Sequence, residues 1–192
     1  MSNVPADEIA IACKGFKICR RQTRAVLKTL RERAPWKFPA GALSVAFVDD
    51  AKTCELHEEF LNDPSKTDVI TFPGDEIFSV PERREILSET PARKRVCAKK
   101  SATENCEEIS DAFAGEIVVC VDQAMRAAVQ FGTSPADEIL LYLVHGWLHL
   151  AGLDDLTDAA RVQMRAAETE AIAILRECGV APFTRISFPP EK

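Results

Sequence analysis

The stretch from Leu141 to Asp155 reads Leu-Tyr-Leu-Val-His-Gly-Trp-Leu-His-Leu-Ala-Gly-Leu-Asp-Asp, with His145 and His149 four residues apart. On a helix, that spacing puts both imidazoles on one face, one turn apart. Gly152 follows and suits the left-handed position at which a helix ends and the chain turns back. After such a turn the carboxylate of Asp155 comes close to the two imidazoles.

Two imidazoles and one carboxylate form a ligand set that suits Zn²⁺ and leaves a fourth position open. We therefore predict that His145, His149 and Asp155 bind one zinc ion per chain, and we expect no small-molecule cofactor. The alternative is a pair of buried, hydrogen-bonded core histidines, since the flanking residues are strongly apolar. The chain has only three histidines, and the presence of two of them here favours the metal.

The composition is that of an ordinary globular protein. The chain has 192 residues, 46% hydrophobic and 28% charged, which is enough for one domain, 1–192, with a full core. No apolar run approaches a membrane span, and the first residues lack a signal-peptide pattern. The seven cysteines include no C-x-x-C pair, which fits a reducing compartment. We therefore expect a cytoplasmic protein without a membrane partner.

The net charge of −6 is unevenly distributed. Residues 14–37 contain nine basic residues and one acid, Glu32, which makes this segment net +8. A basic stripe is typical of a surface that contacts a phosphate backbone, although a solvated helix face is an equal alternative. The candidate RNA-binding residues are Arg20, Arg21, Arg24, Lys28 and Arg31.

Periodicity and turn residues predict alternating strands and helices, followed by three helices. The predicted strands are 8–14, 43–49, 67–73 and 115–121, and the predicted helices are 19–34, 50–61, 122–131, one from Ser134 through both histidines, and 158–178. Residues 74–113 are expected to form a long, mobile inserted loop with a short helix near 81–88, and the tail is expected to be irregular. The fold class is then α+β: a single small mixed sheet of about four strands, with helices packed on it and the histidine helix central.

Three motifs carry a resemblance to a known family. Residues 145–155, HGWLHLAGLDD, resemble the H-G-x-L-H-L-x-G-Y-D-H motif of the YbeY family. Residues 67–73 are similar to that family's T-D-V-L-S-F-P strand, and residues 115–119 resemble its G-D-I-V-I strand. The resemblance covers about residues 43–178. It implies a zinc-dependent endoribonuclease, specific for single strands, that acts in ribosomal RNA maturation or ribosome quality control, with ribosomal RNA or the ribosome as partner.

Two residues depart from the family pattern. The family's third ligand is usually histidine, whereas this chain has Asp155, whose charge makes metal-bound water a poorer acid. We predict a more basic pH optimum or a slower enzyme, and a pH–rate profile matching that of Asp155→His would refute this. An ungapped alignment places Leu61 where the family has a phosphate-binding arginine, and phosphoryl chemistry relies on such a cation. Lys66 or the cluster at 93–95 are candidate substitutes.

The sequence does not identify a general base. Asp68, Glu116, Asp154 and His57 are catalytic candidates by proximity to the motifs. Asp68 is also suited to shaping the cleft, and Asp154 to supporting a ligand through a hydrogen bond. His57 is either a contact near the metal or an ordinary surface histidine.

Two other functions remain open. The ligand spacing resembles that of metzincin proteases, but these carry a glutamate base directly after the first histidine. Gly146 occupies that position and has no side chain to take a proton, which disfavours a protease. The second alternative is a non-catalytic RNA- or ribosome-binding factor with a structural metal site, which Leu61 and Asp155 favour. Salt-sensitive RNA binding without cleavage, unchanged in His149→Ala, would distinguish it from the enzyme.

Overall fold

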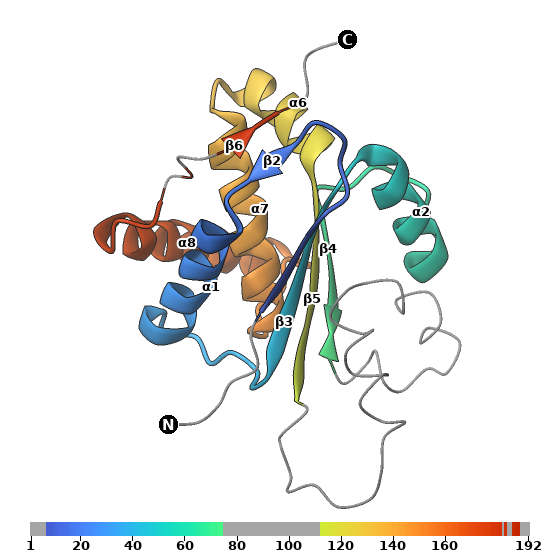
Figure 1. Ribbon diagram of the computed structural model, residues 1–192. Coiled ribbons are helices and arrows are strands. Elements are labelled where there is room, and N and C mark those ends of the chain that lie inside the picture. The colour runs from blue at the N-terminus through green and yellow to red at the C-terminus, as the bar shows by residue number, and fades with distance from the viewer. Residues whose placement is uncertain (1–6, 75–111, 182, 184–185, 189–192) are drawn as a thin grey trace, which may run out of the picture.

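A four-stranded sheet forms the centre of the fold in our computed structural model, which describes residues 7–74, 112–181, 183 and 186–188 (Figure 1). Across the sheet the strands are β1 (Glu8–Ile11), β3 (Ala42–Val48), β5 (Phe113–Cys120) and β4 (Val69–Pro73). The first three are parallel, and β4 runs antiparallel to β5 as an edge strand. The sheet is therefore mixed, which confirms the predicted α+β class.

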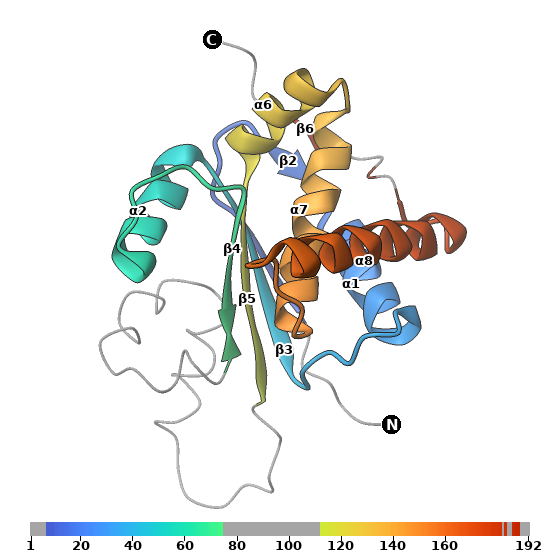
Figure 2. The same cartoon turned by 180° about the vertical axis from the view of Figure 1, so that it is seen from behind.

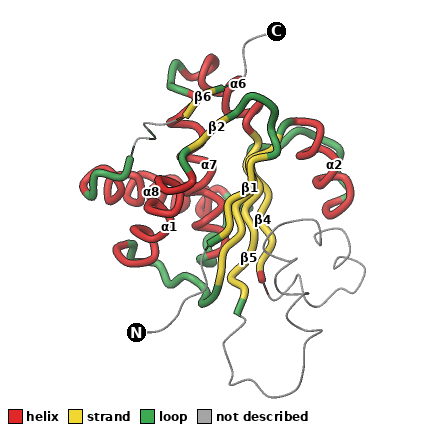
Figure 3. The backbone as a smooth tube through the Cα atoms, in the orientation of Figure 1, coloured by secondary structure: helices red, strands yellow, loops and turns green. Residues whose placement is uncertain are grey.

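Helices cover both faces of this sheet, as Figure 3 shows by the narrow band of strands between them. One face carries α2 (Asp50–Leu61), and the other carries α1 (Arg20–Arg33), α6 (Val121–Phe131), α7 (Pro135–Leu150) and α8 (Asp158–Glu177). Ile117 and Val119 of β5 pack in the larger core beneath α7, whereas Val118 packs with Leu56 and Phe60 of α2. A strand buried on both faces is expected to be apolar throughout, as β5 nearly is.

α7 is the central helix, as predicted. The Ser134 hydroxyl accepts a hydrogen bond from the Asp137 N–H at 3.1 Å, and Pro135 occupies the first turn. The helix packs against α6, α8, β4 and β5. After it, Gly152 has a φ of +96°, a conformation that favours glycine and reverses the chain.

α8 crosses α7 on the outer side of the molecule (Figure 2). It begins after Thr157, whose hydroxyl accepts a hydrogen bond from the Ala160 N–H at 3.1 Å, as the sequence predicts. Its buried face contains Met164, Ala167, Ala171 and Leu175.

The prediction of an irregular tail is wrong where the structure describes it. Residues Ile186–Ser187 form β6, which pairs antiparallel with β2 (Lys17–Ile18), and Phe188 packs against Phe16 with ring centroids 5.6 Å apart. Two-residue strands are too short to produce a periodic signal. The predicted insertion, 74–113, and its short helix lie almost entirely outside the described residues, but Phe113 already belongs to β5. None of the described helices has the length and apolarity needed to cross a membrane.

Candidate metal centre

The last turns of α7 and the loop after it bring the three predicted ligands together. The Nε2 atoms of His145 and His149 are 2.9 Å apart. The Asp155 carboxylate lies 3.8 Å from Nε2 of His145 and 3.9 Å from Nε2 of His149. One ligand atom from each residue lies within 4.8 Å of the other two. The three donors therefore converge on one point.

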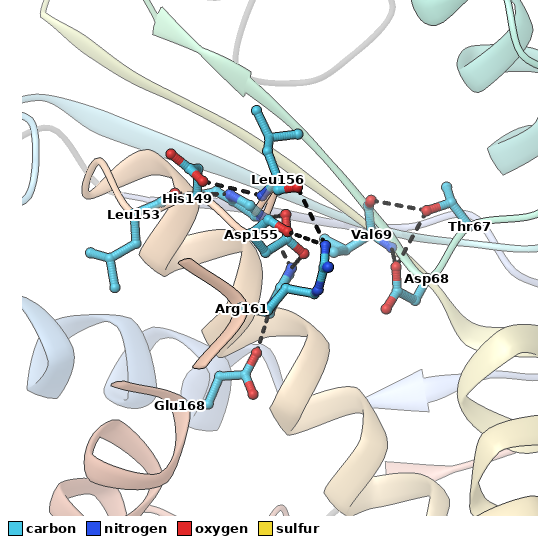
Figure 4. Close-up of polar contacts among 11 residues, drawn as sticks. Thr67, Asp68, Val69, His149, Leu153, Asp155, Leu156, Arg161 and Glu168 are labelled. Atoms are coloured by element: carbon cyan, nitrogen blue, oxygen red, sulfur yellow. Dashed lines mark hydrogen bonds and ion pairs between the residues drawn. The ribbon is translucent and has the colours of Figure 1, made fainter. Parts of the chain in front are cut away.

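The outer nitrogens of both imidazoles have partners that fix the rings, and these partners, Leu153 and Glu168, are labelled in Figure 4. Nδ1 of His145 lies 2.6 Å from Oε1 of Glu168, and Nδ1 of His149 lies 3.0 Å from the carbonyl oxygen of Leu153. An ionised carboxylate and a carbonyl only accept hydrogen bonds, so each neutral ring carries its proton on Nδ1. Each Nε2 then presents a lone pair to the centre, which is the arrangement of metal-binding histidines.

This donor set fits a divalent cation. Two Nε2 lone pairs at 2.9 Å repel each other unless a cation or a proton lies between them. Nitrogens bound to one tetrahedral Zn²⁺ are roughly 3.3 Å apart, from a Zn–N distance of about 2.0–2.1 Å. A small increase in the distance between the two Nε2 atoms therefore accommodates zinc. The Asp155 side chain is 41% exposed, which leaves room for a further ligand.

The electrostatic surroundings also favour a cation. Burial lowers the pKa of His145, but the hydrogen bond that its ring donates to Glu168 and the charges of Glu168, Asp68 and Asp155 outweigh burial and raise the pKa above its ordinary value of 6.5. Three carboxylates therefore act on one imidazole. The same negative potential attracts a metal ion.

A pocket of about 350 Å³ opens beside the cluster, between α7 and the edge strand β4. Leu61, at the end of α2, lines this pocket and is 57% exposed. The position aligned with the family's arginine thus lies in the same pocket as the ligands. Among the described residues the full lining is Leu61, Thr67, Asp68, Val69, Ile70, Thr71, His145, His149 and Asp155, with no lysine or arginine.

Gly146 lets α7 pack closely on the sheet. A Cβ built there would lie 2.7 Å from Cγ2 of Ile117 and 3.0 Å from Cγ2 of Val69. The residue after the first histidine therefore faces the sheet and not the metal cluster. A glutamate base of the protease type has no room at this position, which adds a steric argument against the protease.

Of the four catalytic candidates, only Asp68 lines the pocket. Its Oδ1 accepts hydrogen bonds from the Val69 N–H at 2.9 Å and the Thr67 hydroxyl at 3.3 Å (Figure 4). Because these bonds hold the carboxylate at the start of β4, Asp68 is fixed near the histidines. Its charge contributes to the raised pKa of His145.

The other three candidates lie elsewhere. Glu116 is buried and receives a hydrogen bond from the Ser44 hydroxyl at 3.1 Å. It lies two residues before Val118 and therefore shares the α2 face of the sheet with it. Asp154 is exposed and accepts the Leu156 N–H at 3.2 Å, which shapes the ligand loop. His57 has Nδ1 3.0 Å from the carbonyl oxygen of Ser65 and is not among the pocket-lining residues.

The basic helix α1 is separate from this pocket. α7 lies between α1 and β4 in both views of the ribbon (Figures 1 and 2), and no α1 residue lines the pocket. Three of its candidate RNA contacts hold the start of β1. Arg20 donates to the Ile9 carbonyl at 3.0 Å, Arg24 donates to the Asp7 carbonyl at 3.1 Å, and Arg31 pairs with the Asp7 carboxylate at 3.0 Å. Arg21 and Lys28 are exposed.

Glu168 is the functional residue that sequence reasoning missed. It lies on α8, 23 residues after His145, so no local motif contains both. A weak signal was available, because Glu168 follows Met164 by four residues and precedes Ala171 by three on the buried face of α8. A carboxylate on an apolar helix face needs a partner.

Comparison with known proteins assigns the chain to a family. The family model described as Endoribonuclease YbeY matches residues 11–176. Proteins named Endoribonuclease YbeY from Thermobifida fusca and Protochlamydia amoebophila are each 31% identical, over 90% and 70% of this chain and 88% and 71% of theirs. One from Micrococcus luteus is 35% identical over 63% of this chain, which spans 62% of that relative's length. The chain therefore belongs to the YbeY family of endoribonucleases.

Proposed function

We propose that this protein is a hydrolytic endoribonuclease that depends on a divalent cation, zinc in the first instance, held by His145, His149 and Asp155. The observation that carries the proposal is the convergence of two Nε2 lone pairs and a carboxylate within 4.8 Å. Family membership supports RNA as the substrate class. The same proposal includes ribosomal RNA as the substrate, the ribosome as partner and the cytoplasm as compartment. The described cysteines are all free, which is what a reducing compartment favours.

When bound, the cation would polarise a phosphoryl oxygen and make the attacking water or 2′-hydroxyl more acidic. The protein's own groups orient the reactants. Glu168 and the Leu153 carbonyl hold the imidazoles in one tautomer, which keeps both Nε2 atoms directed at the centre. Asp68 is the pocket carboxylate outside the ligand set, and we assign it the role of accepting or orienting the proton of the nucleophile.

Single-stranded RNA is the substrate form that we propose. The reacting phosphate must reach a pocket of about 350 Å³ between β4 and α7. An unpaired backbone is free to enter such a pocket and splay its bases, whereas an A-form duplex presents a broad, regular surface.

The test is cleavage of one end-labelled RNA, offered single-stranded and as a duplex, to wild type, His149→Ala and Asp68→Asn. We expect cleavage of the single strand by wild type, loss of cleavage on chelation, and recovery on adding zinc. His149→Ala should lose on the order of 100-fold or more in rate, since removing a ligand removes the cation's contribution. Equal rates for wild type and His149→Ala would overturn the proposal.

A non-catalytic RNA-binding factor is the second candidate, favoured by the absence of lysine and arginine from the described pocket lining. In that case the exposed Arg21 and Lys28 of α1 would contact phosphates. RNA binding that weakens with salt, is lost in the double variant Arg21→Ala/Lys28→Ala and is unchanged in His149→Ala, without any cleavage, would establish this alternative.

A further inference from the structure

The loop that carries Asp155 is fastened to the start of α8 by one side chain, Arg161 (Figure 4). Nη1 of Arg161 donates to the carbonyl oxygen of Asp155 at 3.1 Å and to that of Leu156 at 3.3 Å. Nη2 forms an ion pair with Asp158. A single guanidinium therefore joins the backbone of the third ligand to the first turn of the helix.

Helix stability explains the i,i+3 ion pair of Arg161 with Asp158, but not its hydrogen bonds to the carbonyl groups of the ligand loop. α8 begins at Asp158, so Arg161 lies in its N-terminal region, where the helix dipole disfavours a cation. Its backbone N–H already donates to the Thr157 carbonyl at 2.8 Å as an ordinary helical bond. The side chain instead folds back over the helix start to reach two carbonyl groups of the ligand loop.

Asp155 needs such a support more than the two histidines do. The histidines belong to the rigid helix α7, and each has a second ring nitrogen with an acceptor. The Asp155 side chain is 41% exposed, and its carboxylate pairs with these two imidazoles at 3.8 and 3.9 Å. The place of the carboxylate therefore depends on the backbone at residues 155–156, which Arg161 holds by its carbonyl groups and Asp154 by the Leu156 N–H.

We propose that Arg161 is a positioning residue of the metal centre: by fixing the backbone of Asp155, its guanidinium sets the affinity of the site for a divalent cation. The inference rests on the proposed function for the cation itself. It assigns Arg161 no contact with metal or substrate. Supports of this kind outside the ligand shell typically change metal affinity by about 10–100-fold.

The experiment measures zinc affinity of the full-length chain by competition with a chromophoric chelator. The variants are Arg161→Met, which keeps the aliphatic stem without any donor, and Arg161→Lys, which keeps the charge but loses the planar fork. Arg165→Met is the matched control, because Arg165 is an exposed arginine one turn later on the same helix. The thermal midpoint of each protein is measured with and without zinc, and the visible spectrum is recorded with Co²⁺ bound.

We expect zinc to bind about tenfold or more weakly in Arg161→Met, several-fold more weakly in Arg161→Lys, and unchanged in Arg165→Met. The rise in midpoint on adding zinc should shrink in the same order, and the Co²⁺ spectrum should change only in the Arg161 variants. A merely structural role would lower the metal-free midpoint and leave both the affinity and the spectrum unchanged, and that result would overturn the inference. If Arg161→Met does not fold, unchanged affinity in Arg161→Lys overturns it equally. Wild type that binds no zinc would instead overturn the proposed function.

Discussion

Nδ1 of His145, on α7, lies 2.6 Å from Oε1 of Glu168, on α8. This contact joins two helices that cross each other, and it directs Nε2 of His145 towards His149 and Asp155. Glu168 is thus the hydrogen-bond acceptor that a metal-binding histidine needs at its second ring nitrogen. The crossing of α7 and α8 thus helps to assemble the candidate metal centre.

Replacing Glu168 should weaken the site without dismantling the fold. In Glu168→Gln the amide oxygen still accepts a hydrogen bond, but the negative charge is lost, so we expect zinc affinity to fall by about tenfold. In Glu168→Ala we expect zinc affinity to fall further, by about 100-fold. Glu170→Gln, an exposed glutamate two residues away, is the control. Equal zinc affinity in Glu168→Ala and wild type, measured by chelator competition, would show that the contact does not orient His145.

Leu61→Arg should increase RNA cleavage. The side chain is 57% exposed at the pocket, so an arginine fits without disturbing the core, and it places a cation where the described lining has none. We expect kcat/KM on single-stranded RNA to rise on the order of tenfold or more. Val129→Arg adds the same charge at an exposed position of α6 away from the pocket. An equal gain in that control would mean that the effect is only general attraction of RNA.

Gly146→Ala should destabilise the protein. The added Cβ would approach Cγ2 of Ile117 to 2.7 Å and Cγ2 of Thr71 to 3.2 Å, so α7 or the sheet must shift. We expect a loss of about 1–3 kcal/mol in the free energy of unfolding, despite the better helix propensity of alanine. Urea denaturation measures this loss. Combining the change with Ile117→Ala, which removes the opposing methyl group, should cost less than the sum of the two single changes; additive costs would contradict the packing account.

An ion pair between α2 and α6 should make stability depend on pH. Arg126 binds both oxygens of Asp50, at 2.7 and 2.8 Å, and Lys66 adds a contact at 2.7 Å. The hydrogen bonds from Arg126, followed by that from Lys66, hold the pKa of Asp50 well below its ordinary value of 3.8. Because the folded-state pKa is lower than the unfolded one, this stabilisation is present above about pH 4 and is lost as the pH falls further.

We therefore expect Asp50→Asn to be less stable than wild type near pH 7, by up to about 1 kcal/mol, with the difference shrinking between pH 4 and pH 2. Thermal melts of both proteins across this range measure it. Arg126→Gln should lose the same pH-dependent part of the free energy of unfolding. A difference that stays constant from pH 7 to pH 2 would contradict the assignment to this ion pair.

The elements near the metal centre could be predicted because their signals are local. Ser134 and Thr157 cap their helices by accepting a hydrogen bond from an N–H three residues later, and the spacing of His145 and His149 alone places both on one helical face. The apolar runs at residues 43–49 and 115–121 likewise predicted the strands that the structure shows as β3 and β5. These predictions needed only neighbouring residues.

What the sequence could not show depends on contacts between distant segments. Because β5 is apolar on both faces, its sequence does not show which face of the sheet carries Glu116. The structure places Glu116 on the face that α2 covers. The pairing of β2 with β6 joins residues 17–18 to 186–187. The arginines of α1 form a basic pattern in the sequence, yet Arg20 and Arg24 are drawn towards the backbone of residues 7–9.

Metal content tests the central claim most directly. Wild type, Asp155→Ala and the control Asp63→Ala, which changes an exposed aspartate outside the pocket, are purified without chelators and analysed by plasma mass spectrometry. We predict about one zinc per chain in wild type and in the control, and clearly less in Asp155→Ala. Wild type without stoichiometric metal, or an Asp155→Ala protein that retains all of it, would contradict the assignment of His145, His149 and Asp155 as the metal centre.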